Sequence, residues 1–242
     1  MRRRRLLATV AVAALVLSAG CTGGSGVSDQ QLAQSATYDW GTNANATVAV
    51  NATGGQYQAV MNVTGANETT LRFARQSQLG GTNPISISAI QFRYPNGTVV
   101  NATSIQVSRS SSAVTVTLPS KRGQFAYTAP AGSRSLAVPV LLSNVSYEVV
   151  LPTSMRTDLP IIGSVSPGGY QQTVRNDRIH LHWSAVTANT IDVQYYLMRD
   201  VILFGGLLLL AGLIALGGVV YYRRQIRGLE RDREESGLDF KE

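Results

Sequence analysis

The chain has 242 residues, a formal excess of seven positive charges, and 44% hydrophobic residues. A basic balance can indicate a nucleic-acid-binding protein, but four of the 21 basic residues are clustered at residues 2–5 and the others are scattered. No basic stripe with interleaved aromatic residues occurs, which excludes nucleic-acid recognition. Cys21 is the only cysteine, so the chain has no pair for an intrachain disulfide.

The first 20 residues have the form of an export signal. Arginines at residues 2–5 are followed by an apolar run over residues 6–19, which is shorter than the roughly 20 residues of a spanning helix. Small residues precede Cys21, as in a lipobox. We therefore expect residues 1–20 to be a signal peptide and Cys21 to carry a lipid. A signal peptide cleaved nearby, or an uncleaved anchor, is the alternative.

A β domain is expected over residues 36–197, after a flexible tether of Gly, Ser and Gln over residues 21–35. Apolar and polar residues alternate with a period of two along this region, which predicts short strands. Pro95-Asn96-Gly97 and Asn176-Asp177 predict the turns of two hairpins. The expected fold class is mainly β: an antiparallel, β-sandwich-like ectodomain of one or two sandwiches, with a possible subdivision near residues 119–150.

The alternation also predicts a bulge and a core. Apolar residues occupy odd positions up to Ala89 and even positions from Ile90, and such a change of phase is typical of a β-bulge. The apolar face of the strands gives the candidate core, which is Tyr57, Met61, Phe73, Ile87, Phe92, Val116, Tyr147, Leu181 and Trp183.

A second anchor is expected at residues 198–222. Residues 201–220 carry no charge, and this length is enough to cross a bilayer as a helix. Arg223, Arg224 and Arg227 follow it, so the positive-inside rule predicts a cytoplasmic tail over residues 223–242 and an extracellular β domain.

Asn-X-Ser/Thr sequons agree with an extracellular domain, because they indicate an exposed polar surface in an exported protein. Some of these asparagines are expected to carry glycans, whereas others only form turns. The seven sequons begin at Asn45, Asn51, Asn62, Asn67, Asn96, Asn101 and Asn144.

Candidate chemistry is sparse. His180 and His182 share one face of a strand, a spacing that can hold zinc or copper, but a third ligand is needed and two surface histidines are the alternative. We expect no cofactor. The stretch over residues 151–169 has no clean alternation and mixes charged with apolar residues, which favours a partner-binding loop. Its candidate contact residues are Arg156, Asp158, Pro160 and Ile162. For its apolar residues 159–163, a membrane-facing patch and burial beneath the sandwich are the alternatives.

Several segments together resemble an uncharacterised family of haloarchaeal membrane-anchored lipoproteins. They are Ala19-Gly20-Cys21, residues 151–163, Gly168-Gly169-Tyr170 and residues 195–200. The resemblance implies an ether-type lipid on Cys21 and no known activity. An actinobacterial surface lipoprotein is the competing origin, since this ectodomain is not strongly acidic.

Two classes of function follow. The first is a non-catalytic surface lipoprotein that binds an envelope protein or glycan. The second is a sensor or assembly factor whose ectodomain signals through the helix to the tail. A metal-assisted hydrolase is a third, less favoured reading.

Overall fold

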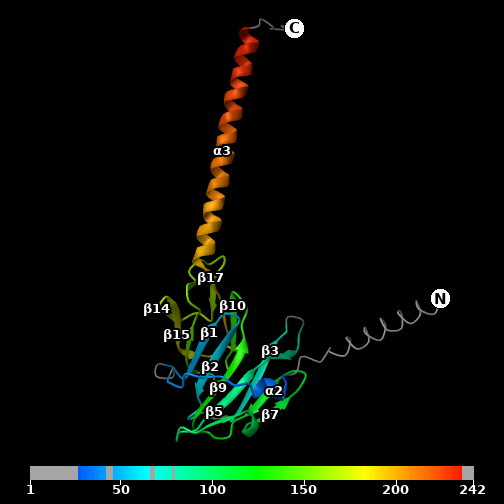
Figure 1. Cartoon of the computed structure of the whole chain (residues 1–242), viewed down its shortest axis with the longest axis vertical. Helices are drawn as coiled ribbons and strands as arrows, with labels where there is room; N and C mark the ends of the chain where they lie inside the picture. Colours follow the sequence, from blue (N-terminus) through cyan, green and yellow to red (C-terminus); the bar gives the residue numbers. More distant parts are fainter. Residues whose placement is uncertain (1–26, 42–45, 66–68, 78–79, 236–242) are drawn as a thin grey trace, which may run out of the picture. The chain divides into compact units, whose positions relative to one another are not determined.

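A computed structural model describes residues 27–41, 46–65, 69–77 and 80–235 (Figure 1). The chain divides into two units, Met1–Tyr195 and Tyr196–Glu242. The first unit holds a short helix and most strands, and the second holds the strand β17 (Tyr196–Leu197) and the long helix α3 (Met198–Glu235).

The largest sheet of the first unit has eight strands, in the order β14-β15-β11-β1-β2-β9-β5-β6. All neighbours are antiparallel except β1 and β11, which run parallel with Val48 opposite Tyr147. The bounds are β1 (Val48–Thr53), β2 (Gln56–Asn62), β5 (Ser88–Arg93), β6 (Val99–Asn101), β9 (Gln124–Pro130), β11 (Val145–Val150), β14 (Gln171–Arg175) and β15 (Arg178–Val186).

Two smaller sheets complete the first unit. One has the order β4-β3-β8-β7 and the other β10-β16-β13. Their bounds are β3 (Thr70–Gln76), β4 (Thr82–Pro84), β7 (Gln106–Arg109), β8 (Val114–Thr117), β10 (Ser135–Pro139), β13 (Ser164–Ser166) and β16 (Thr190–Gln194). The remaining elements are α2 (Asp29–Leu32), a 3-10 helix η3 (Ala102–Ser104) and β12 (Met155–Arg156).

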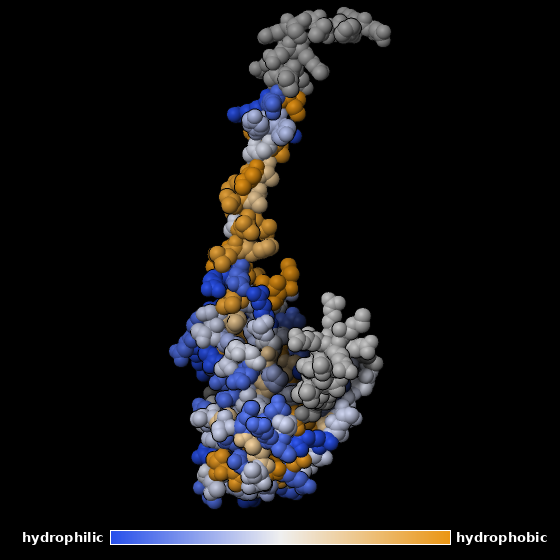
Figure 2. Space-filling model, turned by 45° about the vertical axis from the view of Figure 1, so that its right-hand side comes forward, coloured by the Kyte–Doolittle hydropathy of each residue, from blue (hydrophilic) through white to orange (hydrophobic). Residues whose placement is uncertain are grey.

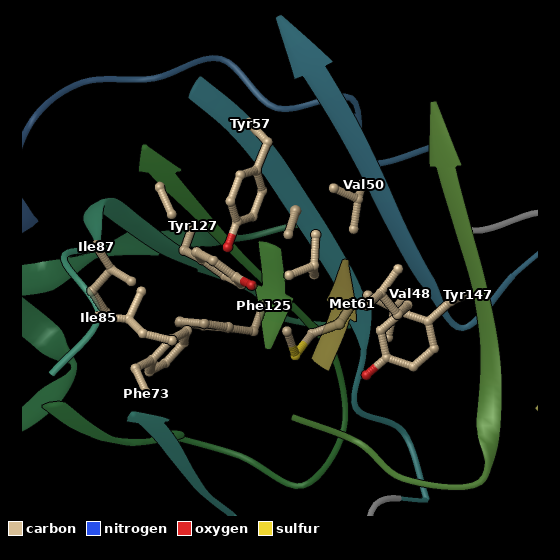
Figure 3. Close-up of a cluster of buried hydrophobic side chains, with 14 of the residues drawn as sticks. Val48, Val50, Tyr57, Met61, Phe73, Ile85, Ile87, Phe125, Tyr127 and Tyr147 are labelled. Atoms are coloured by element: carbon tan, nitrogen blue, oxygen red, sulfur yellow. The ribbon is translucent and has the colours of Figure 1, made fainter. Parts of the chain in front are cut away.

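A single hydrophobic core joins the three sheets. It takes Tyr127 from the eight-stranded sheet, Phe73 from the four-stranded sheet and Ile191 from the three-stranded sheet. Phe73 packs edge-on against Tyr127 with ring centroids 4.9 Å apart (Figure 3). All nine predicted core residues are buried. The antiparallel, sandwich-like fold class is therefore confirmed.

The predicted turns and bulge are present. Gly97 has a φ of 88° in the turn between β5 and β6, and Asn176 and Asp177 both have positive φ between β14 and β15. Left-handed conformations at both central residues are typical of a tight hairpin turn. The register of β5 against β9 shifts between Ser88 and Gln91.

Residues 27–35 differ from the expected flexible tether. Val27 and Leu32 are buried in the main core, and Ser28 caps α2 through a reciprocal capping box with Gln31. Burial of two aliphatic side chains favours an ordered segment, and the cap satisfies backbone donors at the start of α2. The composition of this segment is polar, so the two buried residues were not visible as a pattern.

The helix α3 begins at Met198, where the second anchor was expected. Within α3, the stretch Met198–Arg227 contains an 18-residue window with a mean hydropathy of 2.5 and is long and apolar enough to cross a membrane. Its apolar side chains are exposed along this length (Figure 2).

Candidate binding cleft and membrane anchor

A cleft of about 370 Å³ lies on the face of the eight-stranded sheet that points away from the core. Side chains alternate across a strand, so the residues between the buried ones line this face. Its lining residues are Asp39, Gly41, Ala49, Val50, Asn51, Gln58, Val60, Glu148, Val150, Arg175, Asn176, Arg178 and His180.

One wall of the cleft is the segment before β1, which packs on the outer face of the sheet. The Tyr38 hydroxyl donates to the Ala89 carbonyl at 2.7 Å and lies 2.9 Å from Thr128 Oγ1. Ala89 is the bulged residue, with a φ of 52°. The Tyr38 ring packs with Val60, and Trp40 packs edge-on against it. The bulge thus supplies the carbonyl that holds this wall in place.

Arg178, at the start of β15, forms hydrogen bonds to the strand β1 and to the residue after β11, beneath the cleft. Arg178 Nη2 donates to Asn51 Oδ1 at 2.6 Å and to the Ala52 carbonyl at 2.9 Å, and Nε donates to the Leu151 carbonyl at 2.7 Å. Burial lowers the pKa of Arg178 below its ordinary value. These bonds join β15 to β1 across β11, so Arg178 stabilises the sheet beneath the cleft.

A carboxylate and an imidazole form a pair inside the cleft. Glu148 Oε1 and His180 Nδ1 are 2.9 Å apart, and both side chains are largely buried. The pair can accept and donate hydrogen bonds to a polar ligand. None of the lining residues is Ser, Thr or Cys, so the described lining has no hydroxyl or thiol nucleophile beside this pair.

The two histidines that sequence reasoning singled out separate in role. His180 lines the cleft, whereas His182, two residues along the same strand, is not among its lining residues. Within the described part of the chain, no group of three or more His, Cys, Asp or Glu residues is placed to hold a metal ion.

The expected partner-binding loop is fastened to the β14–β15 hairpin by its polar residues. Arg156 Nη2 donates to Asp177 Oδ1 at 2.9 Å, and Gln172 Nε2 donates to Asp158 Oδ1 at 3.1 Å. Pro160 and Ile162 are exposed. Arg156 and Asp158 thus make contacts within the chain, and Asp158 is exposed together with the apolar residues 159–162.

Four sequon asparagines lie on the surface: Asn62, Asn96, Asn101 and Asn144 are all exposed. Asn51 is different, because its side chain is half-buried in the cleft and accepts the bond from Arg178. A glycan on Asn51 would occupy the cleft and disturb this hydrogen bond. Cys21, Asn45 and Asn67 lie outside the described residues, as does the signal segment.

Glu148 and Arg178 were missed as site residues, and Asn51 was predicted only as a glycosylation sequon. Their signal in the sequence was a charged or amide side chain at an outward position of an otherwise apolar strand. That signal cannot show which strands become neighbours: β1 and β11 are about 100 residues apart and pair directly.

These features define a class of protein: a β-sandwich-like domain followed by one apolar helix that is long enough to cross a membrane. The chain belongs to DUF5803, a family of unknown function, which matches residues 42–241 and therefore covers the eight-stranded sheet and all of α3. No curated protein and no solved structure matches the chain.

Proposed function

We propose that this chain is a non-catalytic surface lipoprotein of a cell membrane, which holds its β domain outside the cell to bind an envelope component. The observation that carries the proposal is the position of α3. A spanning-length apolar helix begins at Met198, three residues after the β unit ends at Tyr195. A domain joined to a membrane helix by so short a connection stays at the membrane surface.

The proposed orientation has the β domain outside and the C-terminus in the cytoplasm. Arg223, Arg224 and Arg227 follow the apolar part of α3, whereas Arg199 before it is offset by Asp200. Basic residues near the end of a helix favour the cytoplasmic side. The four exposed sequons suit glycans on the outer surface, and a lipid on Cys21 would add a second anchor. The same features fit the haloarchaeal lipoproteins that the sequence resembles.

The cleft is the proposed binding site. Its volume of about 370 Å³ is within the range of ligand pockets. An aliphatic floor with a carboxylate, an imidazole and amides at its walls suits a polar, hydrogen-bonding group such as a sugar unit or a side chain of an envelope protein. A non-catalytic role fits the described lining, where no hydroxyl or thiol side chain accompanies the Glu148–His180 pair.

Two matched histidine variants test the site. We expect His180→Ala to weaken recovery of a component that co-purifies with the full chain from native membranes, because it removes one half of the pair at the cleft. His182→Ala is the control, since His182 lies on the same strand but outside the cleft. Equal recovery with both variants would overturn the cleft as the site. Metal-dependent substrate turnover by the purified chain would overturn the non-catalytic role.

The length of α3 supports a second function, that of a sensor or assembly factor. The helix continues without a break beyond Arg227 to Glu235, so the tail could dock a cytoplasmic partner. A chain that ends after Arg227 should then lose a cytoplasmic co-purifying protein and keep its membrane location. A surface-binding protein would lose nothing by this truncation.

A further inference from the structure

We propose that the turn over residues 159–162 is a second membrane contact, which lies in the headgroup and acyl boundary of the bilayer that α3 crosses. The proposal rests on the membrane anchoring in the proposed function and names the lipid surface as the partner of this turn. Three observations carry it: the exposure of the turn, the way it is held, and the end of the sheet at which it lies.

The turn presents aliphatic side chains to the outside. Ile161 is 95% exposed, and Leu159 and Ile162 are 40% and 44% exposed. A short aliphatic cluster that protrudes from a surface is typical of a segment that meets another apolar phase. Most other large exposed apolar side chains among the described residues belong to α3.

The turn is preformed and closed at its base. The amides of Ile162 and Gly163 both donate to the Leu159 carbonyl, at 3.1 and 2.7 Å. A Cβ atom on Gly163 would come within 2.6 Å of the Thr157 carbonyl oxygen. Glycine therefore permits the close approach of the backbone at the two ends of the loop. Thr157 is buried there and donates to Gln172. The aliphatic tip is therefore presented by a fixed base.

The register of the three-stranded sheet places the turn at the end of the sheet where β16 ends and the chain continues toward α3. The strand β13 is antiparallel to β16, with Ser164 opposite Gln194. Ser164 follows the turn directly, and Gln194 is the last residue of β16 before the chain continues to α3. The turn and the connection to α3 therefore leave the same end of this sheet. Four residues from Gln194 to Met198 span at most about 14 Å.

The neighbouring strand adds a cation at the same end. Ser135, the first residue of β10, also lies opposite Gln194, and the Tyr195 amide donates to the carbonyl of Arg134. The side chain of Arg134 is exposed. Aliphatic side chains and an exposed cation at the same end of a sheet suit the boundary between acyl chains and lipid phosphates. This chemistry favours a lipid surface over a protein partner.

A fluorophore at the tip tests the contact. Cys21→Ser leaves no native cysteine, and in this background Ile161→Cys is labelled with a polarity-sensitive probe in the full chain, reconstituted into phospholipid vesicles. We expect a blue shift and strong quenching by spin labels on the acyl chains. Val99→Cys is the control, because Val99 is also exposed but lies at the opposite end of β9. Val99 pairs with Arg93, which lies opposite Gln124 at the start of β9. Tyr195, which precedes α3, instead bonds to Gly132, just beyond the last residue of β9.

The outcomes separate the proposal from the anchor on which it rests. Quenching at position 161 and not at position 99 supports the contact. Equal, weak quenching at both positions overturns it, provided that the same vesicles retain the chain after alkaline extraction. Loss of the chain from extracted vesicles would instead overturn the anchoring by α3. Shielding of position 161 in native membranes but not in vesicles would also overturn the proposal and identify a protein as the partner.

Discussion

Two buried tyrosines differ in whether their hydroxyls have partners. The Tyr147 hydroxyl donates to the Leu142 carbonyl at 3.0 Å and accepts from its amide at 3.3 Å. The Tyr57 hydroxyl is buried and makes no hydrogen bond of normal geometry with a described residue, although the neighbouring Tyr127 side chain acts to lower the Tyr57 pKa. Burial raises the pKa of both tyrosines to about 12. An unpartnered buried hydroxyl costs free energy, whereas a partnered one contributes to stability.

The tyrosine pair gives the first prediction. Tyr147→Phe should lower the free energy of unfolding by about 1 kcal/mol, because it leaves the Leu142 groups unpaired. Tyr57→Phe should leave the stability unchanged or raise it. Chemical denaturation of the two variants and the unmodified chain in detergent measures both values. A larger loss for Tyr57→Phe would show that its hydroxyl has a partner.

Acid should weaken the β14–β15 turn through Asp177. Hydrogen bonds from Ser154 and then Arg156 lower the pKa of Asp177 below 3.8. Because the folded-state pKa is depressed, this contribution to stability is complete above pH 3.8 and is lost as the pH falls through the folded-state pKa. The turn should therefore loosen only in strong acid.

Asp177→Asn tests this contribution. Asparagine tolerates the positive φ of this position, so the turn keeps its shape while the charge is removed. At pH 7 the variant should unfold at a lower temperature than the unmodified chain. As the pH falls through the lowered folded-state pKa of Asp177, the two melting temperatures should converge, because Asp177 becomes protonated. A constant difference across this range would assign the effect to the turn and not to the charge.

Glycines at two turns of the eight-stranded sheet differ in their surroundings. Gly55 has a φ of 88° in the β1–β2 turn, and a Cβ there would meet nothing within 4 Å. Gly123 has a φ of 142° just before β9, and a Cβ there would lie 2.4 Å from the Arg93 carbonyl oxygen and 2.7 Å from Phe92 Cζ. The backbone of β5 and a core ring thus occupy the space at Gly123.

Gly55→Ala should cost about 1–2 kcal/mol of stability, through backbone strain alone. Gly123→Ala should cost roughly 2–5 kcal/mol, because strain is joined by an overpacked contact. Thermal unfolding measures the difference. Similar melting temperatures for both variants would show that β5 and Phe92 can move aside.

The sequence predicted the elements whose conformation depends on a few neighbouring residues. The turns at Gly97 and at Asn176-Asp177 depend on residues that accept positive φ, and the bulge near Ala89 appears as a change of phase. The cleft has no such local signal. Glu148 and His180 approach each other only because β11 pairs with β15, and the floor exists because β11 also pairs in parallel with β1. Periodicity does not encode pairings at this separation.

The expected partner-binding loop also shows what the sequence alone could not predict. Its mixture of charged and apolar residues was read as one binding surface. In the fold, Arg156 pairs with Asp177 and Asp158 accepts from Gln172, so its polar residues fasten the loop. Composition alone could not distinguish side chains that hold a loop from those that the loop presents.

At the scale of the whole molecule, the two proposed anchors differ in strength. A single lipid chain binds a membrane reversibly, whereas a spanning helix does not leave it. Cys21→Ser should therefore change the processing and gel mobility of the chain but leave it in the membrane fraction after alkaline extraction. Release of this variant into the medium would show that α3 does not anchor the protein.

If Cys21 carries a lipid, the burial of Val27 in the core limits the distance between the β domain and the membrane. Only six peptide units join these residues, a reach of roughly 20 Å when fully extended. Because α3 follows the last residue of the β domain, the chain would be attached to the membrane at both ends of this domain. A second attachment to the membrane would raise the effective concentration of the β domain at the bilayer and so favour the proposed lipid contact at residues 159–162. The N-terminal lipid would then restrict the rotation of the β domain, so that the same side of the domain always faces away from the membrane.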